Sequence, residues 1–204
     1  MATAPFVLNH LDHRRFACTP TIFKVKERSR IRIYIRELVG VHDVFVPTGS
    51  IFIARPPGVN ADPEFLRGFQ ISVQDRLRRG DIVKMECRGP DAVGHALRAF
   101  CEFQGDTIEF ESNWLQSSVS GDDTKDSSQA NAIVLRARRG QTWSVFNKTD
   151  FSKTILLFSK PSTTVAKLAW AAVQEIHKTG LAVIHAYSDN KDAVNVAIKS
   201  MATM

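Results

Sequence analysis

The sequence predicts an α/β fold, of the two-layer α+β type, in which one arrangement of strands and helices occurs twice. Residues 91–101 align without gaps on residues 192–202, with Asp, Ala, Val and Ala identical and with conservative Leu/Ile and Arg/Lys exchanges. Upstream of each copy lie, in the same order, a strand that ends in a basic residue and proline, a helix-like segment, and a glycine before an apolar run. Four landmarks in one order indicate an internal duplication.

The first unit is expected over residues 50–139 in the order β-α-β-α-β-β. Asp62 can cap the first helix, which starts with proline and ends at Gly80. Pro90 opens the second helix. The polar tract at residues 117–129 cannot bury a core, so it is interpreted as a mobile hairpin tip. The expected strands span residues 50–54, 82–87, 107–115 and 132–138.

The second unit is expected over residues 154–204, with strands at 155–158 and 181–187, and it lacks the last two strands of the first unit. Two segments near the N-terminus alternate apolar and polar residues, which predicts a β-hairpin at residues 21–37 with Arg28 and Ser29 at its turn. We hypothesise that this hairpin completes the sheet of the second unit, as in a circular permutation.

Residues 1–20 are interpreted as a loose basic arm. Residues 14–19 have the Arg-x-Phe-x-x-Thr pattern of a mitochondrial processing site, and Asp12 is the only acid in the arm. This pattern favours a mitochondrial protein, with a cytoplasmic one as the other possibility. A disordered terminus is the alternative interpretation of the arm.

The net charge of +6 is concentrated at the two ends of the chain. Residues 1–50 contain eight Lys and Arg against four Asp and Glu, residues 51–150 contain 13 against 14, and residues 151–204 contain six against three. Basic ends of this kind favour a polyanionic partner.

Several classes of protein are disfavoured by composition. No apolar run approaches the roughly 20 residues of a membrane-spanning helix, so no membrane partner is expected. The three cysteines, Cys18, Cys87 and Cys101, show no CxxC spacing and no disulfide framework. No metal site and no cofactor are expected.

Two stretches of the sequence resemble a known superfamily. Residues 159–166, 180–187 and 193–202 resemble the stage V sporulation protein S family, which belongs to the Alba-like fold. The first unit resembles Alba through Arg55 with its following proline, through Arg88 with its following glycine, and through the helix after them. The two resemblances cover about three quarters of the chain. The first unit departs from the pattern in its Pro-rich loop, its acids and its long insertion.

The resemblance implies a small α/β sandwich that binds DNA or RNA and pairs with a second copy. Here the two units can pair within the chain, or the protein can form a homodimer or heterodimer. In this family the basic residue after the first strand, the glycine turn before the second helix and the arm of the last two strands approach the phosphates. By position, these correspond to Arg55, Arg88, Lys125, Arg136, Arg138 and Arg139 in the first unit and to Lys160 and Lys191 in the second.

The chemistry of helix starts favours two of these residues independently. A helix N-terminus presents unpaired N–H groups and a partial positive charge, so a cation just before it forms a phosphate seat. Lys160, which precedes Ser162 and Thr163, fits this arrangement, and Arg88 before Pro90 fits it with one donor fewer.

The predicted hairpin and one tryptophan add further candidates. The polar face of the hairpin would carry Lys24, Lys26, Arg32, Tyr34 and Arg36, as nucleic-acid contacts or as charges that keep an edge strand soluble. Trp143 follows a pair of arginines, and it and Tyr34 are candidates for stacking on an unpaired base. The alternative for Trp143 is packing against the arginine stems.

An enzymatic function finds little support in the sequence. Glu109 and Glu111 alternate on one expected strand near Asp106, and such acids can hold magnesium for phosphodiester cleavage or can simply form a solvated face. No phosphate loop and no nucleophile with a base in a known pattern occurs. No catalytic residue is therefore expected.

The prediction is a non-enzymatic protein that binds nucleic acid through phosphate contacts. RNA is preferred over DNA because the cations are scattered, and the setting is a ribonucleoprotein complex with other protein subunits. The main alternative is a protein-interaction scaffold of such a complex with little RNA affinity of its own. A DNA-compacting protein or a magnesium-dependent nuclease is a weaker alternative.

Overall fold

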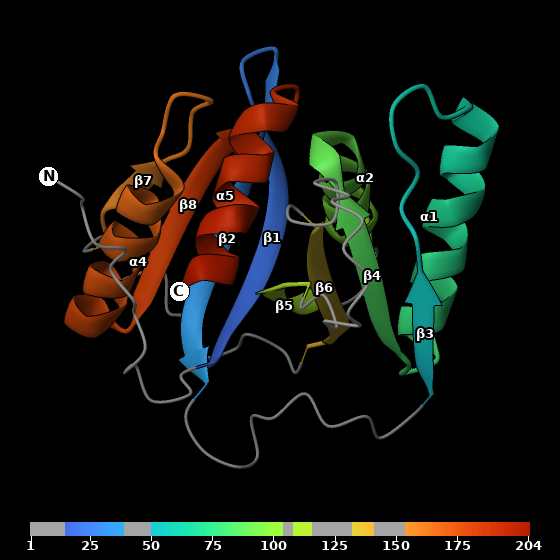
Figure 1. Cartoon of the computed structure of the whole chain (residues 1–204), viewed down its shortest axis with the longest axis horizontal. Coiled ribbons are helices and arrows are strands. Elements are labelled where there is room, and N and C mark those ends of the chain that lie inside the picture. The colour runs from blue at the N-terminus through green and yellow to red at the C-terminus, as the bar shows by residue number, and fades with distance from the viewer. Residues whose placement is uncertain (1–14, 39–49, 104–107, 116–131, 141–153) are drawn as a thin grey trace, which may run out of the picture.

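The computed structural model describes residues 15–38, 50–103, 108–115, 132–140 and 154–204. In this part of the chain, one eight-stranded mixed sheet carries four α-helices (Figure 1). None of the described helices is long and apolar enough to cross a bilayer. The mixed α/β class expected from the sequence is therefore observed.

The first half of the sheet has the predicted β-α-β-α-β-β order. Its elements are β3 (Ile51–Ala54), α1 (Pro63–Arg78), β4 (Ile82–Arg88), α2 (Gly89–Cys101), β5 (Ile108–Trp114) and β6 (Ala132–Arg139). The Asp62 side chain caps α1 by accepting a hydrogen bond from the backbone N–H of Glu64. Gly80, with a φ of +82°, follows the helix in the left-handed conformation that glycine adopts without strain. Local signals read from the sequence thus set the limits of this helix.

The second half is assembled from both ends of the chain. Its elements are β7 (Leu156–Phe158), α4 (Val165–Thr179), β8 (Leu181–Tyr187) and α5 (Lys191–Thr203), together with β1 (Arg15–Val25) and β2 (Arg28–Leu38). Strand β2 pairs antiparallel with β8, from Arg30 opposite Tyr187 to Arg36 opposite Leu181. The hairpin β1–β2 therefore lies beside β8 as β5–β6 lies beside β4, which is the pairing hypothesised from the sequence.

The two halves meet in the middle of the sheet, whose strand order is β3-β4-β6-β5-β1-β2-β8-β7. Strand β1 pairs antiparallel with β5 where Cys18 lies opposite Phe110, and α2 packs against α5. The ring of Phe110 is fully buried and stacks on Phe100 of α2, with centroids 5.6 Å apart. One continuous hydrophobic core therefore spans both halves.

The structure corrects two boundaries near the N-terminus. Residues 15–20, expected in the loose arm, form the first part of β1, because Ala17 and Cys18 are buried between β2 and β5. The hairpin turn is at Lys26 and Glu27, two residues earlier than expected, since Val25 pairs with Arg28. Residues 1–14, the tract at 117–129, Asp106, Lys125 and Trp143 lie outside the described residues.

Candidate nucleic-acid interface

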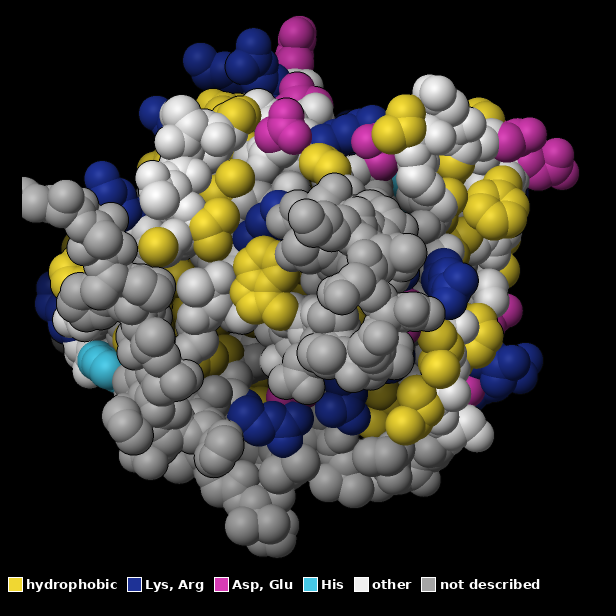
Figure 2. Space-filling model, in the orientation of Figure 1, with side chains coloured by type: hydrophobic (Ala, Val, Ile, Leu, Met, Phe, Trp, Pro, Cys, Tyr) yellow, Lys and Arg dark blue, Asp and Glu magenta, His cyan; other side chains and the backbone are white. Residues whose placement is uncertain are grey.

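One end of the molecule brings the hairpin turn next to the starts of two helices. The backbone N–H and the hydroxyl of Ser188, just before α5, both donate to the carbonyl of Ser29, at 3.2 and 2.9 Å. The hairpin turn, the start of α5 and the loop before α4 lie at the upper end of Figure 1. Lys24, Lys26 and Arg28 are exposed here. Lys and Arg side chains gather at this end, with acidic side chains among them (Figure 2).

Lys160 lies in a tightly held turn between β7 and α4. The preceding residue, Ser159, donates its backbone N–H to the His185 carbonyl at 2.8 Å and its hydroxyl to the Ala193 carbonyl at 2.6 Å. The Lys160 side chain is exposed, and α4 begins after Thr164, which makes no side-chain capping bond. Ser162 and Thr163, expected at the helix start, lie just before it, and Lys160 is an exposed cation in the turn that leads to a helix start without a side-chain cap.

Lys191, at the start of α5, has an acidic partner in the other half. Its ammonium group forms an ion pair with Asp91 of α2. The side chain of Asn190 accepts the backbone N–H of Ala193 at 3.0 Å and so caps the helix. The positive charge of Lys191 and one backbone N–H of this helix start therefore already have partners within the protein.

Arg55 and Arg88 are both exposed in the first half. The Arg55 side chain is 83% exposed, and its Nε lies 4.0 Å from a carboxylate oxygen of Glu86. Arg88 precedes α2 with an extended backbone and no side-chain capping bond, and Gly89 after it has a φ of +83°. The acid beside Arg55 weakens its attraction for phosphate, whereas Arg88 keeps the geometry that the sequence predicted.

Three other predicted arginines lie on the face of the sheet away from the helices, near buried carboxylates. Glu109 is 2% exposed, and its two oxygens lie 3.0 Å from Arg36 Nη2 and 3.1 Å from Arg138 Nη2. Arg136 lies opposite Glu111 in the register of β5 and β6. Arg36 and Arg138 therefore neutralise a buried acid between the halves, a role that the sequence did not reveal. Arg139, at the end of β6, is exposed.

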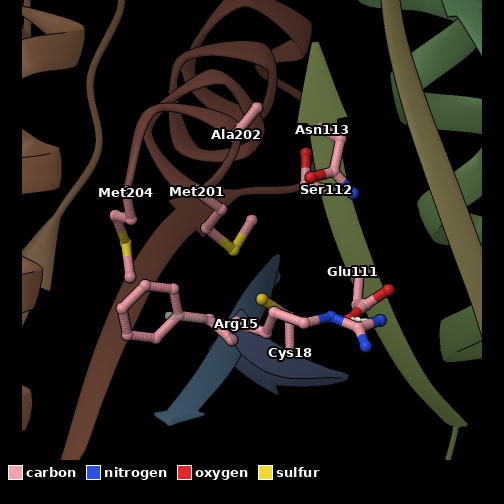
Figure 3. Close-up of a pocket in the computed structure, with 9 residues that line it drawn as sticks. Arg15, Cys18, Glu111, Ser112, Asn113, Met201, Ala202 and Met204 are labelled. Carbon is pink, nitrogen blue, oxygen red and sulfur yellow. Dashed lines mark ion pairs between the residues drawn. The ribbon is translucent and has the colours of Figure 1, made fainter. Parts of the chain in front are cut away.

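The acids considered for magnesium are also engaged. Arg15 of β1 forms an ion pair with Glu111 of β5, and Figure 3 shows the two side chains meeting in a small pocket beside Cys18 and Met201. Burial raises the pKa of the Glu111 carboxyl, and the Arg15 guanidinium opposes this shift. The described residues contain no group of three His, Cys, Asp or Glu side chains placed to hold a metal ion. These contacts give no support to the nuclease alternative.

The thiols are equally unsuited to catalysis. Burial raises the pKa of Cys18, and it raises the pKa of Cys87 and of Cys101 to about 12. A protonated thiol is a poor nucleophile and a poor metal ligand.

A cluster of aromatic and basic side chains occupies the same sheet face in the second half. The ring of His185 lies 5.5 Å from Phe158 of β7 and 5.5 Å from Phe23 of β1, both edge to face. Arg32 stacks over Phe23 at 4.5 Å, and its Nε donates to His185 Nε2 at 2.6 Å. We call this cluster, together with the neighbouring residues of the same sheet face, the aromatic face. It comprises Phe23, Arg28, Arg30, Arg32, Tyr34, Phe158, His185 and Tyr187.

The other members extend the aromatic face toward the hairpin turn. Arg30 and Arg28 lie 5.0 and 5.8 Å from the centre of the Tyr187 ring. Tyr34 is half-buried and accepts a hydrogen bond from Arg32 Nη1 at 3.1 Å. Sequence reasoning found only Arg32 and Tyr34, because the other members become neighbours only through the register of β2 on β8 and of β7 on β8.

Burial and the nearby arginines keep His185 neutral. Its ring is 4% exposed, and burial, followed by the charges of Arg32 and Arg30, lowers the pKa of His185 to about 4. Because Nε2 accepts from Arg32, the hydrogen-bond pattern assigns the ring proton to Nδ1. The aromatic face is thus held together by a neutral histidine at neutral pH.

Comparisons with family models, curated proteins and solved structures give no match for this chain. The function is therefore inferred from the chemistry of the site itself.

Proposed function

We propose that this protein is a non-enzymatic nucleic-acid-binding protein that contacts the phosphates of RNA within a ribonucleoprotein complex. The observation that supports this proposal most is the distribution of charge once the hairpin is assigned to the second half. The described residues of that half contain twelve Lys and Arg against five Asp and Glu, and those of the first half contain eleven against nine. A net charge of +7 against +2 makes the second half the favoured side for a polyanion.

The position of the exposed cations supports the same proposal. Lys24, Lys26 and Arg28 surround the hairpin turn, and Lys160 precedes α4 at the same end of the molecule. Cations and uncapped helix starts bind phosphate oxygens without reading the base sequence. Binding with little sequence preference and strong salt dependence is the expected behaviour.

A salt titration of binding to single-stranded RNA tests this function. We expect the logarithm of the association constant to fall steeply with the logarithm of the salt concentration. Lys160→Ala should weaken binding to all sequences and reduce the slope by about 0.7, the value for one lost phosphate contact on a single strand. Lys178→Ala, an exposed lysine at the other end of α4, is the matched control and should change neither quantity.

A different class of function, a protein-interaction scaffold, is favoured by one observation. Several large apolar side chains on and near β3 and α1 are exposed, and the group comprises Ile51, Ile53, Val59, Phe65 and Ile71. A contiguous apolar patch on a surface is typical of protein contacts, and Ile51 and Ile53 share one face of β3 by alternation. If the salt titration detects no RNA binding and a protein that co-purifies with the chain is lost in a Phe65→Ser variant, the scaffold function replaces RNA binding.

A further inference from the structure

The two halves place an exposed apolar side chain at equivalent positions. Ile53 and Phe158 each lie two residues before a basic residue followed by proline. Each lies on an outer strand, opposite Lys84 of β4 and His185 of β8 respectively. Their exposed fractions are similar, 59% for Ile53 and 52% for Phe158. The difference between them is therefore chemical, an aliphatic side chain in one half and an aromatic ring in the other.

The surroundings of Phe158 are also aromatic and basic. Its ring lies edge to face on His185, which in turn contacts Phe23 beneath the Arg32 guanidinium. These contacts hold Phe158 in place from below while half of it remains exposed. A ring fixed in this way loses little conformational freedom when a second flat group stacks on it.

Basic side chains lie within the same surface. Arg28 and Arg30 bring two positive charges beside the Tyr187 ring. A ligand with flat rings, acceptor oxygens and negative charges matches this combination of groups.

The first half offers different groups at the corresponding positions. Lys84 and Glu86 of β4 correspond in register to His185 and Tyr187 of β8, and they lie 4.0 Å from each other. Arg136 of β6 corresponds to Arg32 of β2 and lies opposite Glu111. Paired charges replace the rings, so this half offers no equivalent stacking surface at these positions.

We propose that the aromatic face is a stacking platform for the unpaired bases of single-stranded nucleic acid, with the exposed ring of Phe158 as its outer stacking surface. This inference rests on the proposed function and specifies the class of nucleic acid. In a duplex the base faces are already stacked on each other, whereas a single strand can turn its bases onto aromatic side chains. The cations at the hairpin turn and at Lys160 then contact the backbone of the same strand.

The experiment compares a short oligouridylate of about 12 nucleotides with an abasic strand of the same length and charge. Binding of the full chain is measured by fluorescence anisotropy over a range of salt concentrations. Phe158→Ala should weaken binding of the oligouridylate about tenfold, because one stacked base is lost. It should leave the salt slope and the binding of the abasic strand unchanged. Phe158→Tyr keeps the ring and should retain the affinity of the parent protein.

Ile53→Ala is the matched control, because it truncates an equally exposed side chain at the equivalent position. We expect it to leave both affinities unchanged. Thermal unfolding of each variant shows whether it is folded. If Phe158→Ala is not, Phe158→Leu, which keeps an apolar side chain without a ring, takes its place and should show the same loss of oligouridylate affinity.

Two kinds of result would contradict the proposal. If the parent protein binds both strands equally, or if Phe158→Ala and Ile53→Ala have the same effect, the stacking platform is wrong while phosphate binding remains. If the parent protein binds neither strand at any salt concentration, the proposed function fails as well.

Discussion

The two halves of this protein share one topology and differ in what they display on the sheet face away from the helices. In the first half, acids on this face form ion pairs with arginines of both halves, as Glu109 does with Arg138 of β6 and with Arg36 of β2. In the second half, the aromatic face on the same side of the sheet holds rings and arginines instead, and among the described residues Arg32 contacts His185 and Phe23 rather than a carboxylate. In two halves of one topology, positions that face the core are constrained by packing, whereas outward positions are free to differ.

The halves also differ in how the chain connects them. The first half is continuous from β3 to β6, whereas the second takes β1 and β2 from the N-terminal side and its remaining elements from the C-terminal side. The hairpin therefore lies in the middle of the sheet, where β1 pairs with β5 of the first half and β2 pairs with β8 of the second half. Loss of the contact between the halves should therefore affect the whole molecule.

The largest expected effect is that of breaking the shared core. Phe110→Ala removes a fully buried ring from the strand where the halves meet, and it should lower the free energy of unfolding by about 4 kcal/mol. Urea denaturation followed by fluorescence and by circular dichroism should give one coincident transition for both probes. Two separated transitions would show that the halves unfold independently.

The next effect concerns the charges between the halves. Glu109→Gln removes the buried carboxylate charge that Arg36 and Arg138 share, and we expect a loss of about 3 kcal/mol in the free energy of unfolding. Glu86→Gln is the control. Its carboxylate lies 4.0 Å from Arg55 and from Lys84, and its removal should change stability by less than about 1 kcal/mol. Equal effects of the two variants would contradict the structural role assigned to Glu109.

The third effect belongs to the second half alone and depends on pH. Because the pKa of His185 is about 4 in the folded protein and near 6.5 when exposed, the unfolded chain binds the proton more readily between these values. The stabilising effect of the neutral ring is complete above pH 6.5 and is lost as the pH falls toward 4. His185→Gln keeps an acceptor for Arg32 and should flatten the dependence of stability on pH in this window.

Glu111 acts in the opposite direction, since burial raises its pKa and favours the protonated carboxyl of the folded state. The measured quantity is therefore the difference in urea midpoint between the parent protein and His185→Gln, from pH 4 to pH 7. A constant difference across this range would show that His185 does not titrate as its surroundings imply.

Much of the fold was accessible from the sequence because the signals are local. The repeat at residues 91–101 and 192–202 predicted two similar halves, and Asp62 and the glycine at 80 marked the limits of α1. The missing strands of the second unit pointed to the hairpin, and β2 does pair with β8. These inferences need only periodicity, capping and a count of elements.

The candidate site was accessible only in part. Lys24, Lys26 and Lys160 are exposed, and their phosphate contacts stay a prediction. Lys24 was expected on the same hairpin face as Arg32, but it pairs with Ser29 and so lies on the face of Ile31. The ion pairs that Arg36 and Arg138 form with Glu109 were not foreseen from the sequence. Glu109 is 73 residues from Arg36 and 29 residues from Arg138 along the chain. Alternation along a strand shows which face a side chain takes, but it does not show which side chains of other strands share that face.

The sequence by itself determined the duplicated unit, the order of its elements and the basic character of both ends, since each is encoded in neighbouring residues. Only the tertiary structure decided which charges are cancelled and which rings come together. Phe23, Phe158 and His185 are distant in the chain and meet because hydrogen-bond register aligns β1, β2, β8 and β7. Register is a property of paired strands, so the aromatic face exists only in the folded sheet.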